Sequence, residues 1–127
     1  MIEFVLDASG LLAVFNGEAG AERVIELLPV STISAVNLAE VVAKLQERGM
    51  PDDRIRATIE SLELKVDPFD DMLAIETGLL RAATRAAGLS IGDRACLALA
   101  KQHDVPALTA DRAWQKIDFD VRVELVR

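Results

Sequence analysis

The chain has 127 residues, a formal net charge of −7 and hydrophobic residues at 51% of its positions. This length and composition predict one globular domain over residues 1–127, and they exclude disordered, fibrous and low-complexity proteins. The single cysteine, Cys96, and the single histidine, His103, cannot supply an internal disulfide or a zinc site of the usual Cys and His ligands, which leaves oxygen ligands for any metal.

The apolar run at residues 2–6 predicts a buried strand and not a signal peptide. It is short, and it is bracketed by Glu3 and Asp7, where a secretory signal would carry positive charge. No apolar stretch is long enough to span a bilayer. We therefore expect a soluble, cytoplasmic protein with no membrane partner.

Segments with strand and helix patterns alternate along the rest of the chain. After the first strand we expect helices at about 19–28, 35–48, 52–61, 70–87 and 90–103, and a further helical turn from residue 111. Further strands are expected at 30–33, 62–66, 105–109 and 121–126, the last at an edge. This alternation predicts a three-layer α/β/α fold with a mostly parallel central sheet of four to five strands, and sites in such sheets lie beyond the carboxyl ends of the strands.

The acidic balance of the chain restricts its partners. Taken alone it argues against nucleic acid, because backbone phosphates repel an acidic surface. That argument weakens if several acids surround a divalent cation, whose charge would reverse the local potential. Acidity also suits a basic protein partner.

Four carboxylates occupy positions that suit a site. Asp7 and Asp111 each follow a predicted strand, Asp93 begins a helix, and Glu40 lies in the helix after the second strand. Asp93 and Asp111 taken singly are also ordinary helix-capping acids, and Glu40 taken singly is an ordinary solvated helix residue. Asp7 is harder to explain in this way, because a charge that ends a buried strand must be paired, metal-bound or at the mouth of a site.

Three segments carry a more specific pattern: VLDASGLLAVF near the start, STISAVNLAEVVAKL in the first third, and LSIGDRACLALAKQHDVPALTADRAW near the end. Together they resemble the PIN-domain family, and within it the VapC-like ribonuclease toxins of type II toxin–antitoxin systems. The resemblance implies a PIN-like fold over essentially the whole chain. It also implies an endoribonuclease that hydrolyses RNA phosphodiester bonds to leave a 5′-phosphate and a 3′-hydroxyl, a cognate antitoxin that neutralises it, and a homodimer.

In that family the four acids form the catalytic site, and they map onto Asp7, Glu40, Asp93 and Asp111. Carboxylate oxygens suit Mg²⁺ or Mn²⁺. We assign Asp7, Asp93 and Asp111 to direct or water-mediated metal contact, and Glu40 to metal contact or to orienting the attacking water. Acids that share an ion repel one another when it is absent, so we also expect raised pKa values among them.

Five further residues are candidates for supporting roles. The hydroxyls of Ser9 and Thr109 are placed to orient a ligand or a water, or else to bond their own turns. Asn37 lies one helical turn before Glu40, and it either shares the face of that acid or is exposed. Arg94 and Arg112 each follow a site acid, where they contact substrate phosphate or form simple ion pairs.

Other functional classes fit less well. The chain has no P-loop and no dinucleotide-binding glycine motif, and a haloacid-type phosphatase would need an aspartate where Ser9 stands. Trp114 is interpreted as a packing residue in preference to a base-stacking one, and Cys96 and His103 as core and helix-end residues. The alternative function is a catalytically inactive PIN-like protein-binding scaffold, against which the presence of all four acids argues.

Overall fold

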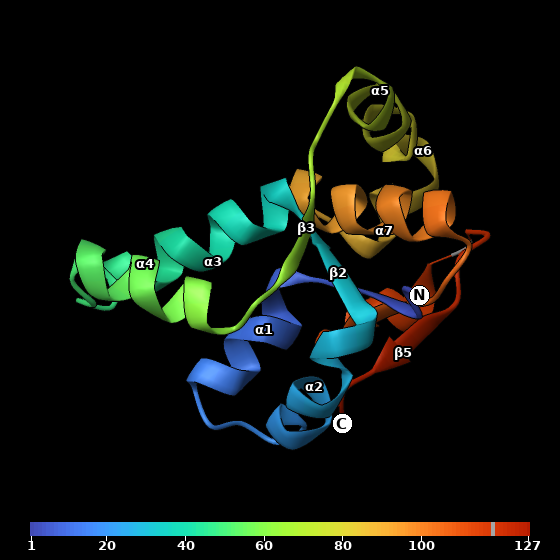
Figure 1. Ribbon diagram of the computed structural model, residues 1–127. Coiled ribbons are helices and arrows are strands. Elements are labelled where there is room, and N and C mark those ends of the chain that lie inside the picture. The colour runs from blue at the N-terminus through green and yellow to red at the C-terminus, as the bar shows by residue number, and fades with distance from the viewer. Residues whose placement is uncertain (118) are drawn as a thin grey trace.

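The structure is a computed structural model that describes residues 1–117 and 119–127. Five strands are separated by helices and short 3₁₀ segments (Figure 1). In chain order the elements are β1 (Phe4–Leu6), α1 (Ala8–Phe15), α2 (Ala21–Leu27), η1 (Leu28–Val30), β2 (Ser31–Ser34), α3 (Ala35–Glu47), α4 (Asp52–Ser61), β3 (Lys65–Asp67), α5 (Asp71–Leu79), α6 (Arg81–Thr84), η2 (Arg85–Ala87), α7 (Ile91–His103), β4 (Ala107–Thr109), η3 (Arg112–Lys116) and β5 (Val123–Leu125).

The strands form one parallel sheet in the order β3-β2-β1-β4-β5. The chain adds β2 and β3 on one side of β1 and then crosses to the other side to add β4 and β5. The order of strands therefore reverses between β1 and β4, and ligands of open α/β sheets bind at the carboxyl ends of the strands at such a point. The prediction of a mostly parallel sheet of four to five strands is confirmed, with β5 at an edge.

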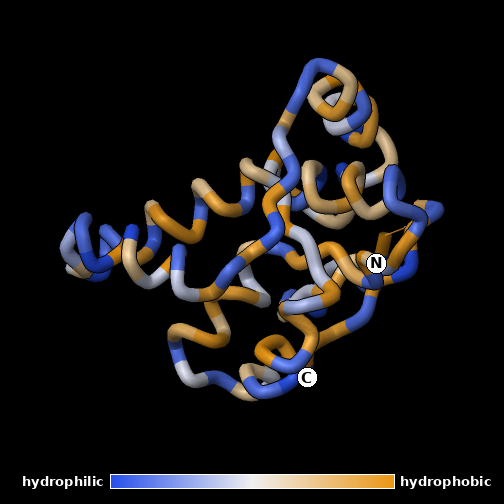
Figure 2. The backbone as a smooth tube through the Cα atoms, in the orientation of Figure 1, coloured by the Kyte–Doolittle hydropathy of each residue, from blue (hydrophilic) through white to orange (hydrophobic). Residues whose placement is uncertain are grey.

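Each face of the sheet packs against its own hydrophobic core. Val5 and Ala107 point to the core formed with α5 and α7, whereas Leu6 and Leu108 point to the core formed with α1, α2 and α3. This alternation is the period-two pattern of a sheet that is covered on both faces. Figure 2 shows the hydrophobic segments along the central strands and a hydrophilic turn where α3 meets α4. The three-layer α/β/α prediction is thus confirmed.

Two helical regions differ from the prediction. Helix α1 was not expected, because its sequence is apolar on several sides and shows no clear helical period; it buries Gly10, Leu11 and Ala13. The single helix expected at 70–87 is broken at Leu80 into α5, α6 and a 3₁₀ turn. Gly78 precedes the break, and glycine lowers helix stability by about 1 kcal/mol relative to alanine.

The residues interpreted as structural do pack in the fold. Trp114 is buried in the core beneath α7, and Cys96 is fully buried. His103 ends α7 with its Nε2 atom 3.0 Å from Asp67 Oδ2. Within the part of the chain that the structure describes, no helix combines the length and apolar character required to cross a membrane.

Candidate active site

The four predicted acids line one pocket at the strand-order reversal. The pocket has a volume of about 390 Å³ and lies where β1, α3, α7 and β4 come together. Asp7 follows β1 and Asp111 follows β4, while Glu40 comes from α3 and Asp93 from the first turn of α7. The fold therefore gathers side chains that are far apart in the sequence, as the sheet-edge argument predicted.

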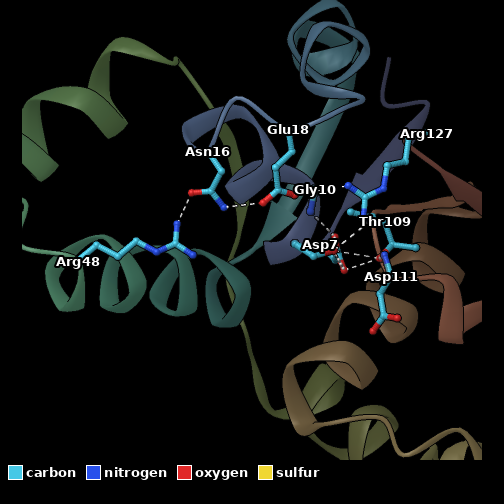
Figure 3. Close-up of polar contacts among 10 residues, drawn as sticks. Asp7, Gly10, Asn16, Glu18, Arg48, Thr109, Asp111 and Arg127 are labelled. Carbon is cyan, nitrogen blue, oxygen red and sulfur yellow. Dashed lines mark hydrogen bonds and ion pairs between the residues drawn. The ribbon is translucent and has the colours of Figure 1, made fainter.

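Asp7 is buried and tightly held, with 2% of its surface exposed. It caps α1, because its Oδ1 atom accepts a hydrogen bond from Gly10 N at 2.8 Å. Ser9 Oγ lies 2.9 Å from Oδ1 and 2.8 Å from Oδ2. Thr109 Oγ1 donates to Oδ2 at 2.7 Å (Figure 3). Ser9 and Thr109 thus orient the acid, as the supporting role assigned to them requires.

The contacts of Asp7 leave it able to accept one more ligand. Each serine or threonine hydroxyl has one hydrogen, so Gly10, Ser9 and Thr109 together donate three hydrogen bonds. A carboxylate offers about four lone-pair sites. About one site of Asp7 is therefore left for a metal or a water.

Burial raises the pKa of Asp7 to about 6 from 3.8, against the opposing effect of its hydrogen bonds from Thr109, Gly10 and Ser9. Repulsion by Asp93 raises the pKa further, but this is the smallest of the causes. A raised pKa was expected from repulsion among the four acids. The expectation was wrong about the main cause, since desolvation of one acid contributes more than its charged neighbours.

Asp93 and Asp111 are held by helix-capping contacts. Asp93 Oδ2 accepts from Ser90 N at 3.0 Å while Ser90 Oγ accepts from Asp93 N at 3.2 Å, which is a reciprocal capping box at the start of α7. Asp111 is exposed, and its Oδ1 atom accepts from Ala113 N at 2.9 Å. Both acids therefore cap a helix and also line the pocket, so the two interpretations hold together.

Glu40 reaches the pocket between α3 and α7. Asn37 Nδ2 donates to Glu40 Oε1 at 2.8 Å and to the carbonyl oxygen of Gly92 at 3.0 Å. Asn37 is buried, with 1% of its surface exposed. Of the two positions considered for Asn37, the structure gives the one beside Glu40 and not the exposed one.

The two candidate arginines do not line the pocket. Arg94 is buried against α5, and its Nη1 atom donates to the carbonyl oxygen of Thr77 at 3.3 Å. Successive helix residues point about 100° apart, so the residue after Asp93 faces away from it. Arg112 is exposed on η3, outside the pocket lining. The structure therefore brings neither arginine to the four acids.

Two pocket residues were not singled out from the sequence. Lys44 and Glu47 line the pocket, and their Nζ and Oε2 atoms lie 3.5 Å apart. Their spacing of four and seven residues from Glu40 places all three on one face of α3. That spacing was the available signal. The pocket thus holds five acids and one lysine.

The site suits a hard divalent cation by the chemical type of its donors. All four predicted residues offer carboxylate oxygens, the ligands that Mg²⁺ and Mn²⁺ prefer. Among the residues that the structure describes, however, no three acidic, histidine or cysteine side chains converge closely enough to hold one ion as they stand. Glu40 and Asp111 are the two exposed members, so their side chains have room to turn toward the others.

The fold and the pocket define a class of protein: a three-layer α/β/α domain whose carboxylates gather where the strand order of the parallel sheet reverses. The chain belongs to the PIN domain family, whose pattern matches residues 4–120. Ribonuclease VapC42 of Mycobacterium tuberculosis is 30% identical over 117 residues, which cover 82% of this chain and 87% of the relative. The predicted family is therefore confirmed.

Solved structures share the fold at lower identity. The DNA-bound VapBC of Salmonella typhimurium matches with a TM-score of 0.78 and 23% identity over 100% of both chains. A toxin–antitoxin complex from Klebsiella pneumoniae matches with a TM-score of 0.71 and 20% identity, over 91% of this chain and 93% of the other. At these identities the likeness shows that the fold is shared.

Proposed function

We propose that this chain is a metal-dependent endoribonuclease toxin of the VapC kind, active in the cytoplasm and neutralised by a cognate antitoxin. The observation that carries the proposal is the convergence of Asp7, Glu40, Asp93 and Asp111 on one pocket of a PIN domain. The name of the relative VapC42, a ribonuclease, supports RNA as the substrate. The toxin–antitoxin complexes that share the fold support a protein inhibitor.

Residues of this chain would have separate roles in hydrolysis. Bound Mg²⁺ or Mn²⁺ would supply an acidified water for attack on phosphorus and a positive charge for the leaving oxygen. Asp7, Asp93 and Asp111 would hold the ion, and Glu40 would share in holding it or orient the attacking water. Ser9 and Thr109 keep the Asp7 carboxylate in one orientation, so little reorganisation is needed when the ion enters.

The charge of the pocket makes a cation necessary for RNA binding. Five acids and one lysine line it, so a phosphodiester would meet net negative charge. A divalent cation reverses the potential at the point where the phosphate must lie. Arg112 is exposed near this edge and stays a predicted phosphate contact, whereas the contact of Arg94 with Thr77 argues against that role for Arg94.

Cleavage of a mixed RNA pool tests the proposal. Protein freed of any copurified antitoxin should cut RNA with Mg²⁺ or Mn²⁺ and should stop when EDTA is added. The products should carry 5′-phosphates, which end-labelling after phosphatase treatment detects. An inert protein that still binds the antitoxin would support the alternative, a binding scaffold without catalysis.

Neutralisation by an antitoxin follows from the charge of the same pocket. A basic side chain from the partner would pair with the carboxylates in place of the metal, since five acids there face one lysine. Excess Mg²⁺ should then compete with the inhibitor and partly restore cleavage by the complex. Inhibition that is unchanged across Mg²⁺ concentrations would contradict a shared site, as would an acidic partner whose removal leaves activity unaltered.

A homodimer is the remaining proposed assembly. Met72, Ile75 and Leu79 are each more than 60% exposed along α5, and their spacing of three and four residues places them on one helical face. Exposed apolar stripes of this kind mark interaction surfaces. A dimer at micromolar concentration in sedimentation should dissociate in Ile75→Glu, and a monomeric wild-type chain would contradict the proposal.

A further inference from the structure

We propose that Gly92 and Asn37 form a seat that fixes the Glu40 carboxylate in the pocket, Gly92 by having no side chain and Asn37 by hydrogen bonding. Both are positioning residues in the sense that they act through Glu40. The proposal rests on the proposed function, because it assigns a purpose to the position of a metal-site acid. Helix formation does not require a glycine at this position of the IGDR segment, whereas positioning Glu40 does.

Gly92 lies directly under the carboxylate of Glu40. A methyl group built at Gly92 would lie 2.1 Å from Glu40 Oε1, 2.6 Å from Cδ and 2.8 Å from Oε2. Contacts this short cannot exist, so an alanine at this position would displace the carboxylate. The displaced atoms are the end of a flexible side chain, and the fold can therefore accept alanine while Glu40 moves. Gly92 is the second residue of α7, where alanine is otherwise a better helix former.

Asn37 holds the same carboxylate by hydrogen bonding. Its Nδ2 group bridges Glu40 Oε1 and the carbonyl oxygen of Gly92, so it connects α3 to α7 at the pocket. Both partners are acceptors, which fixes the amide with its nitrogen toward them. This orientation leaves Asn37 Oδ1 buried with no hydrogen-bond partner in the described structure. A buried acceptor without a partner destabilises the fold, so the contribution of Asn37 lies in holding Glu40.

The seat matters because Glu40 is otherwise unrestrained. The residue is exposed, and an exposed glutamate side chain samples several rotamers. Steric contact below and a charge-assisted hydrogen bond beside it select one arrangement. Oε1 faces Asn37 in this arrangement, which leaves Oε2 for a ligand in the pocket.

Binding of Mn²⁺ alone, measured by calorimetry and by the loss of its free paramagnetic resonance signal, tests the seat without RNA. Gly92→Ala should bind Mn²⁺ about 10- to 100-fold more weakly, the usual effect of losing a residue that orients a ligand. Its melting temperature in EDTA should equal or exceed that of the wild-type chain. Gly78→Ala is the matched control, because Gly78 is also helical and a methyl group there meets nothing within 4 Å. Its Mn²⁺ affinity should be unchanged.

Asn37→Leu separates positioning from stability. Leucine keeps the approximate shape of asparagine and removes the unpartnered oxygen, so the chelated protein should melt no lower than the wild type. Mn²⁺ affinity should still fall, because Glu40 loses its hydrogen bond. A purely structural asparagine would show the reverse, a lower melting temperature with metal affinity intact, and that result would overturn its place in the seat.

The Glu40→Ala background decides whether both residues act through Glu40. In that background, adding Gly92→Ala or Asn37→Leu should weaken Mn²⁺ binding no further. An equal additional loss would overturn the proposal, as would a crystal structure of Gly92→Ala with the Glu40 carboxylate in its original place. A wild-type chain that fails to bind Mn²⁺ would instead overturn the proposed function. The crystal structure of Gly92→Ala would still test whether Gly92 positions the Glu40 carboxylate.

Discussion

Asp7 and Asp111 occupy equivalent places in the fold, yet their surroundings differ. Each follows one of two adjacent parallel strands, and each caps the helical segment that comes next. Asp7 is buried under hydrogen bonds from a glycine amide and two hydroxyls, whereas Asp111 is exposed and accepts one bond from its own turn. The topology thus selects both positions, and the neighbouring side chains determine how each carboxylate is solvated and oriented.

The comparison predicts its largest effect for Asp7→Asn. This change removes a charge with almost no change in volume, so the fold should persist while metal-dependent RNA cleavage falls by more than about 100-fold, beyond the usual effect of a supporting residue. Cleavage rates with millimolar Mg²⁺ or Mn²⁺, together with circular dichroism spectra, measure both outcomes. Lys101→Ala, at the far end of α7 from Asp93, should cut normally. Full activity of metal-replete Asp7→Asn would remove Asp7 from the site.

The second prediction concerns stability in EDTA. The folded pKa of Asp7 is about 6 and the unfolded value is 3.8, so folding favours the protonated acid. Its contribution to stability is complete below about pH 4 and is lost as pH rises through about 6, a loss of about 3 kcal/mol at most. Asp7→Asn has no such group and should lack this pH dependence. Its melting temperature near pH 8 should therefore exceed that of the chelated wild-type chain.

Asp111→Asn sharpens the same test, because an exposed carboxylate gains less from neutralisation. Its melting temperature in EDTA should rise less than that of Asp7→Asn, while both variants should lose part of the stabilisation that Mg²⁺ or Mn²⁺ gives. Glu60→Gln, on α4 outside the pocket, should change neither quantity. Equal metal-induced shifts in the wild type and all three variants would show that the acids do not form one site.

The smallest predicted effects come from the hydroxyls around Asp7. Thr109→Val removes the hydrogen bond that most lowers the pKa of this acid, so the pKa should rise further by about 0.5 to 1 unit. Ser9→Ala should act in the same direction with a smaller effect. The pH midpoint of the stability change in EDTA measures both shifts. A larger shift in Ser9→Ala than in Thr109→Val would reverse the assigned order of the two contacts.

The sequence predicted the sheet and the meeting of the four acids in one pocket, because both depend on local patterns and on the rule that parallel strands end at one edge. It did not predict helix α1, whose apolar residues are buried on more than one side. The sequence was enough to predict that Arg94 points away from the pocket, because Arg94 is adjacent to Asp93 on a helix. It was not enough to predict the role of Gly92, because that role depends on the distance between α3 and α7, which no local pattern specifies.

The hydrogen bond from Thr109 to Asp7 spans 102 residues, and this separation has a consequence for synthesis. A growing chain exposes β1, α3 and α7 first, but β4 joins the sheet only when most of the sequence has left the ribosome. Contacts of such long range form late and slowly. A chain interrupted before β4 would carry Asp7, Glu40 and Asp93 without Thr109 or Asp111. The pocket therefore gains its full set of four carboxylates only after β4 has joined the sheet.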